Sequence, residues 1–473
     1  LVAYDNTGRV RIFSLFVPEG GNARLFGLTK EFQPIHGPIR YYQASQRNKT
    51  FLVGNEKEAA LCYATTASIR RNLTLPFEAV TVAMDAKAEH IGFLDNQGLM
   101  HLYEVNDPHP EAGWTAFFGK VWYEGFSKPR YEWQSTGGTD DFEPKLSLVP
   151  LIAGSLKGTL YAMIFAVPIA LLAAIYTAQF LSPKMKRIVK PAMEIMASLP
   201  SVVLGFLAAL WLAPLIETRV PSVLLVIAAI PISAMVLGWI WGRVPITLRN
   251  RLPKGSEYVL IAPLLMGLAV MGWHLGPALE KVLFVASMPD GKEIADFRLW
   301  WPQFTGLPYD QRNCLVVGFM MGFAVIPVIF TIAEDALSNV PPSLTSASEA
   351  LGASRWQVVR TVVLPVASAG IFSALMIGFG RAVGETMIMV MATGNTPIFD
   401  ENGSFVFGNH WNIFNGMRTL AANIAVELPE AVEGSTHYRT LFLGALLLFM
   451  MTFVMNTAAE VLRQKLREKF KIV

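Results

Sequence analysis

The stretch VPLIAGSLKGTLYAMIFAVPIALLAAIYTAQ (149–179) decides the fold class of this chain. It is almost entirely apolar and exceeds the roughly 20 residues that an α-helix rising 1.5 Å per residue needs to cross about 30 Å of hydrocarbon. One such stretch would also suit a buried helix of a soluble protein, but seven of them after Leu148 would not fit a soluble core. We therefore expect an α-helical polytopic membrane protein, with spans near 149–179, 193–215, 221–242, 258–276, 313–333, 366–393 and 438–460.

The composition agrees with a membrane location. Hydrophobic residues make up 53% of the 473 residues and charged residues only 16%, against roughly 25% in an ordinary soluble chain. The residues before Leu148 are polar and mixed, so the chain divides between two solvents. A net charge of +3 is too small to indicate nucleic-acid binding, and no such partner is expected.

Positive residues predict which side of the membrane each loop faces, because Lys and Arg concentrate in cytoplasmic loops. They follow the first, third and last spans, at Lys184, Lys186, Arg187, Lys190, Arg243, Arg249, Arg251, Lys254, Arg463, Lys465, Arg467, Lys469 and Lys471. These loops are expected to be cytoplasmic. Segments 277–312 and 394–437, which hold most of the acidic residues after Leu148, are expected outside, together with the polar region that precedes the first span.

Neither a metal site nor a cofactor site is expected. Cys62 and Cys314 are the only cysteines, so no disulfide framework or Cys-based metal site is available. The seven histidines show no metal-ligand spacing. The chain begins at Leu1 without an export signal, so a preceding span is expected to have led the polar region across the membrane.

Residues 1–110 predict an extracytoplasmic, β-rich region. LVAYDNTGRVRIFS (1–14) and HIGFLDNQGLMHLYEV (90–105) each contain an Asp-Asn-x-Gly turn next to alternating apolar residues, which is typical of a hairpin. With TFLVGNEKEAALCYA (50–64), their spacing suits β-propeller blades. A partial propeller and an unrelated set of antiparallel strands remain equally open. Residues 111–147 are expected to connect this region to the transmembrane domain, 148–473, along the membrane surface.

A polar segment lies between the fifth and sixth predicted spans, at residues 338–365. It reads SASEALG (346–352), then nine residues, then VVLP (362–365), and predicts two short cytoplasmic helices with Gly352 at the turn between them. An amphipathic loop resting on the membrane surface is the alternative. No phosphate-cradling G-x-x-x-x-G-K-[ST] loop occurs in the chain, so we expect no ATPase activity here and ATP hydrolysis in another subunit.

This segment resembles the EAA loop of type I ABC importer permeases, E-A-A-x-x-x-G followed by nine residues and I-x-L-P. In that family the loop is a coupling helix that sits in a groove of the ATPase subunit. Ser346 stands where the family has its Glu, and Glu349 is the nearest carboxylate. The positions that the resemblance assigns to ATPase coupling are Ala347, Glu349, Ala350, Gly352, Leu364 and Pro365.

The sixth predicted span contains GFGRAVGETM (378–387), which places Arg381 and Glu385 four residues apart. On one helix these side chains would share a face. A charge in the middle of a span costs about 2.5–3.5 kcal/mol on insertion scales, so an intramembrane pair is a functional-site hypothesis by default. Arg381 offers planar donors that suit an oxyanion. The alternative, that the pair only neutralises itself and holds the bundle together, has equal weight.

R-A-x-G-E-T after an EAA loop resembles the C-type permease of the Pst phosphate importer. KPAMEIMASLPSVVLGF (190–206), VIPVIFTIAEDALSNVP (325–341) and the whole of 313–393 extend the resemblance over most of 141–470, in the long variant with a large outer domain. It implies that Arg381, Glu385 and Thr386 line the phosphate pathway. Residues 216–276 depart from the common six-span pattern by two added spans.

The resemblance implies a bacterial inner-membrane protein with its β-rich region in the periplasm. It implies a second permease subunit as a heterodimer partner, two ATP-binding cassette subunits, an outer phosphate-binding protein and a regulatory sensor kinase. The alternatives are a permease for another oxyanion such as sulfate or molybdate, and a membrane-anchored sensor or scaffold. An ion-driven secondary transporter would leave the EAA loop without a role.

A selectivity test follows from the motif. Phosphate near neutral pH keeps a proton that sulfate lacks, so Glu385 could accept a hydrogen bond from phosphate and repel sulfate. Glu385→Gln should narrow the preference for phosphate over sulfate in uptake measurements with both labelled anions. An unchanged preference would reject this role for Glu385.

Overall fold

The computed structural model describes residues 1–18, 20–21, 23–137, 142–245, 258–397, 399 and 411–469. Arg249, Arg251, Lys254 and Lys471, which the sequence analysis named, lie outside the described residues, as does one of the seven histidines, His410. The chain forms two compact units. The first comprises Leu1–Pro150 with Glu430–Leu443, and the second comprises Leu151–Pro429 with Gly444–Val473.

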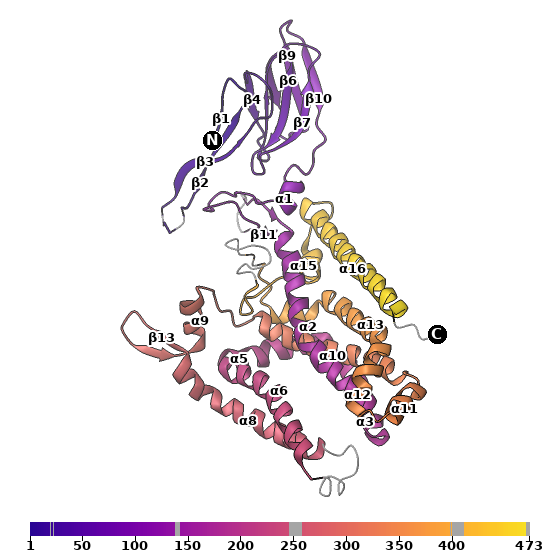
Figure 1. The fold of residues 1–473 in the computed structure, drawn as a ribbon. Helices are drawn as coiled ribbons and strands as arrows, with labels where there is room; N and C mark the ends of the chain where they lie inside the picture. Colours follow the sequence, from indigo (N-terminus) through magenta and orange to yellow (C-terminus); the bar gives the residue numbers. More distant parts are fainter. Residues whose placement is uncertain are drawn as a thin grey trace. The chain divides into compact units, whose positions relative to one another are not determined.

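The first unit is built mainly from three antiparallel sheets (Figure 1). Their strands are β1 (Val2–Tyr4), β2 (Val10–Phe16) and β3 (Leu25–Phe32); β4 (Tyr41–Ala44), β5 (Thr50–Gly54), β6 (Glu58–Tyr63) and β7 (Ser68–Thr74); and β8 (Ala79–Met84), β9 (His90–Asp95) and β10 (Met100–Glu104). Strands β5 and β6 are buried on both faces, because the other two sheets pack against them on opposite sides. Among the described residues the sheets do not close into a propeller ring.

The two Asp-Asn-x-Gly turns have the same local structure, and both predicted hairpins are confirmed. Gly8 and Gly98 have φ values of 87° and 81°, which favour glycine. Asp5 accepts hydrogen bonds from the N–H groups of Thr7 and Arg9. In the second turn Asp95 accepts the equivalent hydrogen bonds from the N–H groups of Gln97 and Leu99. The hydrogen bond from His101 holds the pKa of Asp95 below its usual value, and the backbone donors act in the same direction.

The second unit is helical. Its elements are α2 (Val149–Gln179), α3 (Pro183–Ala197), α4 (Ser201–Leu207), η1 (Ala208–Leu212), α5 (Ala213–Glu217), α6 (Val220–Arg243), α8 (Tyr258–Leu283), β13 (Val285–Ser287), β14 (Glu293–Ala295), α9 (Phe297–Thr305), α10 (Cys314–Ser338), α11 (Pro342–Ala350), α12 (Arg355–Val358), η2 (Val359–Val363), α13 (Leu364–Val383), α14 (Met387–Ala392), α15 (Leu420–Glu427), η4 (Leu428–Glu430) and α16 (Thr436–Lys469). The first residues of α2 and α16 belong to the first unit, which also holds α1 (Trp114–Phe118), β11 (Trp133–Gln134) and β12 (Lys145–Leu146).

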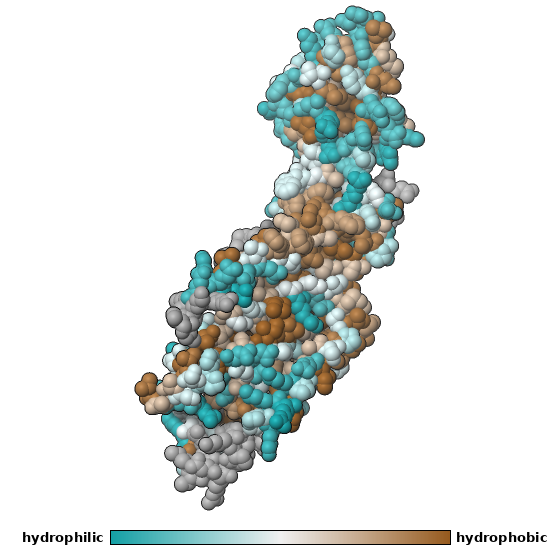
Figure 2. Space-filling model, turned by 90° about the vertical axis from the view of Figure 1, so that its right-hand side faces the viewer, coloured by the Kyte–Doolittle hydropathy of each residue, from teal (hydrophilic) through white to brown (hydrophobic). Residues whose placement is uncertain are grey.

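Six described helices are long and apolar enough to cross a membrane, or seven if one bent pair is a single span. The fold class expected from the sequence is therefore confirmed. Hydrophobic residues gather in broad patches over the helical unit, whereas the β-rich unit is largely hydrophilic on the face that Figure 2 shows. None of the apolar window of α6 is buried within the chain, as expected for a helix whose surroundings are lipid.

Two predicted spans need correction. The range 193–215 is not one straight helix, because α3 and the segment from α4 to α5 meet at 83°. The bend lies at Leu199–Pro200, where the proline disfavours helical geometry in the residue before it. The range 366–393 is also wrong at both ends. A continuous helical span runs from Arg355 to Val383, and α14 follows as a separate helix.

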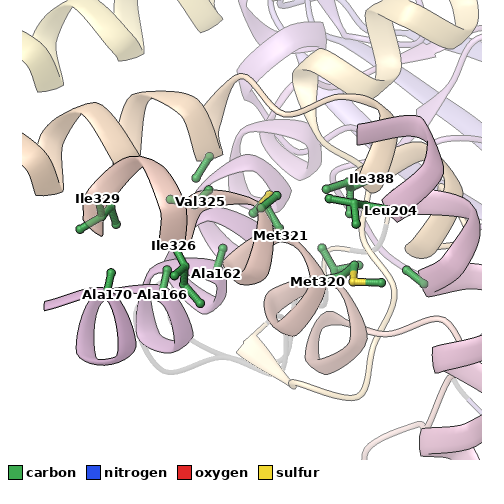
Figure 3. Close-up of a cluster of buried hydrophobic side chains, with 14 of the residues drawn as sticks. Ala162, Ala166, Ala170, Leu204, Met320, Met321, Val325, Ile326, Ile329 and Ile388 are labelled. Carbon is green, nitrogen blue, oxygen red and sulfur yellow. The ribbon is translucent and has the colours of Figure 1, made fainter. Parts of the chain in front are cut away.

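Helix α10 lies at the centre of the helical unit, with 72% of its apolar window buried. Ala162, Ala166 and Ala170 of α2 lie opposite Val325, Ile326 and Ile329 of α10 (Figure 3). Glycines allow the close approach, because a Cβ at Gly318 would lie 3.0 Å from the Cβ of Tyr161. Helix α13 approaches the same helix, and a Cβ at Gly378 would lie 2.4 Å from the side chain of Ile329. Because lipid is as apolar as the side chains, the hydrophobic effect does little to hold these helices together, and close packing of this kind stabilises the bundle instead.

Arg70 anchors the segment that follows the last sheet of the β-rich unit. Its guanidinium donates to both carboxylate oxygens of Asp107, at 2.8 and 2.7 Å, and to the carbonyl of Ala112 at 2.8 Å. Arg70→Lys should lower the stability of this unit by about 1–2 kcal/mol, because an ammonium cannot reproduce the planar fork. Limited proteolysis of the full chain would detect this loss of stability as faster cleavage near residues 105–113. Unchanged cleavage would contradict the prediction.

Candidate functional site

The RAVGET motif lies at a break between two helices. Helix α13 ends at Val383, and α14 begins at Met387. Arg381 occupies the last turn of α13, whereas Glu385 lies in the break and its carboxylate accepts the N–H of Ile388 at 3.5 Å. A carboxylate at the start of a helix satisfies a free backbone donor and offsets the positive end of the helix dipole. The expectation that Arg381 and Glu385 share one helix face is therefore wrong.

Arg381 is exposed on the surface of this chain and forms no ion pair or hydrogen bond with any residue that the structure describes. The self-neutralising Arg–Glu pair that the sequence also permitted is not formed. Thr386 lies beside Glu385, and its hydroxyl donates to the carbonyl of Gly384 at 3.2 Å. Over the described ranges the motif thus contains an exposed cation without a partner, and a carboxylate and a hydroxyl follow it in the break.

Helix α4 supports the far side of the break. A Cβ at Gly205 of α4 would lie 3.0 Å from the carbonyl oxygen of Met387 and 3.1 Å from the Cβ of Met391. Leu204 and Ile388 are both buried and lie beside each other in the core (Figure 3). The start of α14 is therefore positioned by α4, and the end of α13 by α10 through Gly378.

The predicted coupling loop forms a short helix, α11, that buries none of its residues. Ala347, Glu349 and Ala350 are exposed on it, and Leu351 is 91% exposed at its end. Gly352 has φ 86°, which confirms the predicted turn. The N–H of Gly352 bonds to the carbonyl of Glu349, and the N–H of Ala353 bonds to that of Ser348, which together close a Schellman motif.

The second helix of the loop does not end before the membrane span. It starts at α12, where Ser354 and Gln357 form a capping box, and continues through a π-helical turn into α13. The N–H of Leu364 bonds five residues back to Val359, just before Pro365, whose ring would clash with a regular helix. Leu364 and Pro365 are thus half-buried at the start of α13, away from the exposed residues of α11.

Three buried charged sites in the helical unit were not assigned a functional role from the sequence. Glu334 of α10 has a side chain only 1% exposed and pairs with Lys190 of α3. Arg418 donates to Glu427 at 2.6 Å, with both side chains 11% exposed. Lys157 is 5% exposed within α2. Each lies inside or beside an apolar stretch, and such intramembrane charges are the signal that could have singled them out.

Residues 166–468 match the family model described as "Binding-protein-dependent transport system inner membrane component". The chain belongs to this family of transport-system membrane components. Similar curated proteins include phosphate transport system permease protein PstC 1 of Mycobacterium tuberculosis, 27% identical over 66% of this chain and 70% of that protein. The probable ABC transporter permease protein YqgH of Bacillus subtilis is 24% identical over 66% and 71% of the two chains.

PstC of Haemophilus influenzae is 32% identical, but over only 35% of this chain and 48% of its own length. The break between α13 and α14 and the exposed helix α11 both lie inside the part of this transport component that matches the family. Within the described ranges, no group of three or more His, Cys, Asp or Glu side chains is arranged to hold a metal ion.

The exposure of Arg381 in this transport component predicts thiol reactivity. Arg381→Cys should react with a charged, water-soluble thiol reagent in membranes, whereas Ala382→Cys should not, because Ala382 is 2% exposed. Background labelling should be low, since Cys62 and Cys314 are both buried. Equal protection of the two introduced cysteines would show that Arg381 does not face water.

Proposed function

We propose that the chain is the permease subunit of an ATP-driven phosphate importer. The observation that supports this best is Arg381, an exposed cation with no partner among the residues that the structure describes, at a break between helices of a membrane domain. A charge in this position is costly unless it meets another charged group or water. The names of the similar PstC proteins suggest that the group it meets is phosphate.

The residues at the break have complementary roles in this proposal. Arg381 offers planar N–H donors to the phosphate oxygens as the anion passes. Glu385 accepts a hydrogen bond from the O–H group that phosphate still holds near neutral pH, which sulfate cannot offer. Thr386 is beside them as a hydroxyl donor or acceptor. Transient, multi-point contact of this kind would let the anion bind and leave, as transport requires.

The exposed face of α11 is proposed to dock on an ATP-binding cassette subunit. Leu351 at 91% exposure, beside the exposed Ala347 and Ala350, leaves apolar surface uncovered in this chain. The small alanines allow a partner to approach closely. ATP binding by the partners would then move α11, and with it the helix that starts at Arg355 and ends near the anion site.

The remaining partners and the orientation are proposals of the same kind. We place the β-rich unit in the periplasm, since the positive loops predict the opposite side for α11. A second permease subunit would complete the pathway on the face where Arg381 is exposed, and a periplasmic binding protein would deliver phosphate. Bond cleavage would occur only in the ATPase subunits.

Uptake of labelled phosphate by phosphate-starved cells tests this function, with Gly352→Ala as the diagnostic variant. An alanine at φ 86° costs roughly 1–2 kcal/mol and should tilt the exposed end of α11, lowering uptake about tenfold. Gly306→Ala is the matched control, because Gly306 also has a positive φ, 71°, with open space around it, but caps α9.

Normal membrane levels of both variants must be shown first. Loss of uptake in Gly352→Ala alone would support phosphate import coupled through α11. If the wild-type importer takes up sulfate or molybdate but not phosphate, the proposed substrate is wrong and one of these oxyanions takes its place. Full uptake by Gly352→Ala would contradict the coupling role.

A further inference from the structure

An ion cluster around one buried carboxylate lies at the end of α10. The Glu334 carboxylate, 1% exposed, pairs with the ammonium of Lys190 and accepts the hydroxyl of Ser338 at 2.7 Å. The Lys190 ammonium also lies 3.2 Å from Asp335, and the Lys186 ammonium lies 4.0 Å from Glu334. Two helices that are far apart in sequence, α3 and α10, are thereby tied together.

This cluster lies directly before the proposed coupling helix. Ser338 is the last residue of α10, and α11 starts at Pro342. The backbone next to the cluster is held as well, because Gln179 at the end of α2 donates to the carbonyl of Leu337 at 3.2 Å. A displacement of α11 would therefore pull on the end of α10, and through the Glu334–Lys190 pair on α3.

From α3 the contacts lead to the anion site. Helix α3 turns through 83° into α4, and α4 packs against α14 through Gly205, with Leu204 beside Ile388 (Figure 3). Helix α14 starts just after Glu385 and is capped by its carboxylate. The other side of the same break is the end of α13, which is continuous with the coupling loop from Arg355.

We propose that the Glu334–Lys190 pair is a second coupling connection, which transmits movement of α11 through α3 and α4 to α14. The proposal rests on the proposed coupling of α11 to an ATPase. The two sides of the break at 384–386 are then moved by different routes, one along α13 and one through the ion pair. Their relative displacement opens or closes the space between Arg381 and Glu385.

The physical chemistry of the pair explains why it can transmit movement. A carboxylate in a low-dielectric interior is costly to separate from its cation, since an uncompensated buried charge remains. The two helices therefore move together. Removing one partner weakens the link between α3 and α10 and leaves the continuous helix from Arg355 to Val383 unchanged. The variants should still fold, because Lys190 is 40% exposed and Val189 and Met193 of α3 keep their contacts with the core.

The test measures movement at the helix break itself. A Thr386→Cys reporter in the complete importer, in membrane vesicles, is labelled with a thiol reagent with and without ATP, and the ATP-induced change in rate is measured. Glu334→Gln and Lys190→Met should each reduce that change about tenfold, and the double variant should reduce it no further. Lys190→Arg should retain it, because the charge is kept.

Glu217→Gln is the control, since Glu217 pairs with Arg298 at 3.2 Å at the other end of the unit and should change nothing. A full ATP response in Glu334→Gln would overturn the proposal. A reporter that never responds to ATP would also overturn it, because the break would then not move. Absence of phosphate uptake with an intact ATP response would reject phosphate as the substrate and leave the coupling connection standing.

Discussion

A helix that crosses a membrane must satisfy its backbone hydrogen bonds within itself, so any interruption needs support from its neighbours. The interruption between α13 and α14 has that support. The Glu385 carboxylate accepts the N–H of Ile388, and α4 covers the start of α14 through Gly205. Both sides of the break therefore need neighbours, and α10 packs against α13 at Gly378 as α4 does against α14.

Close helix packing supplies that positioning. Helix α10 is buried over most of its length, and glycines and alanines let α2 and α13 approach it. In lipid there is little hydrophobic gain between helices, so the specificity of the bundle comes from such contacts and from polar pairs. The Glu334–Lys190 pair fixes α3 to α10 in the same way, at the end nearest α11. The rigid core and the exposed α11 together suit a protein that moves in response to a partner.

Local features of this fold could be predicted from the sequence, and relations between distant segments could not. Hydropathy located the long helices, and the turn residues located the hairpins at Gly8 and Gly98 and the turn at Gly352. The end of α13 was missed, because RAVGET has no helix-breaking proline and its apolar surroundings continue to 393. The bend at Leu199–Pro200 is visible in the sequence only as a proline, and proline is also tolerated within helices such as α10.

The contact between Glu334 and Lys190 joins two helices that lie far apart in the sequence, so no spacing rule reaches it. The ionisable residues within the apolar stretches were nevertheless visible, and Arg381 was identified from its cost alone. What the structure adds is that Arg381 has no partner among the described residues and that Glu385 is occupied with α14. That difference supports the proposed site for an external anion.

The most direct measurement is phosphate uptake by importers with Arg381→Gln, at normal membrane levels and with ATPase subunits still bound. The account predicts a loss of at least about tenfold, since the neutral amide keeps hydrogen-bond donors but removes the charge that attracts the anion. Uptake equal to that of the wild type would show that the unpaired guanidinium is not on the pathway and would contradict the central claim.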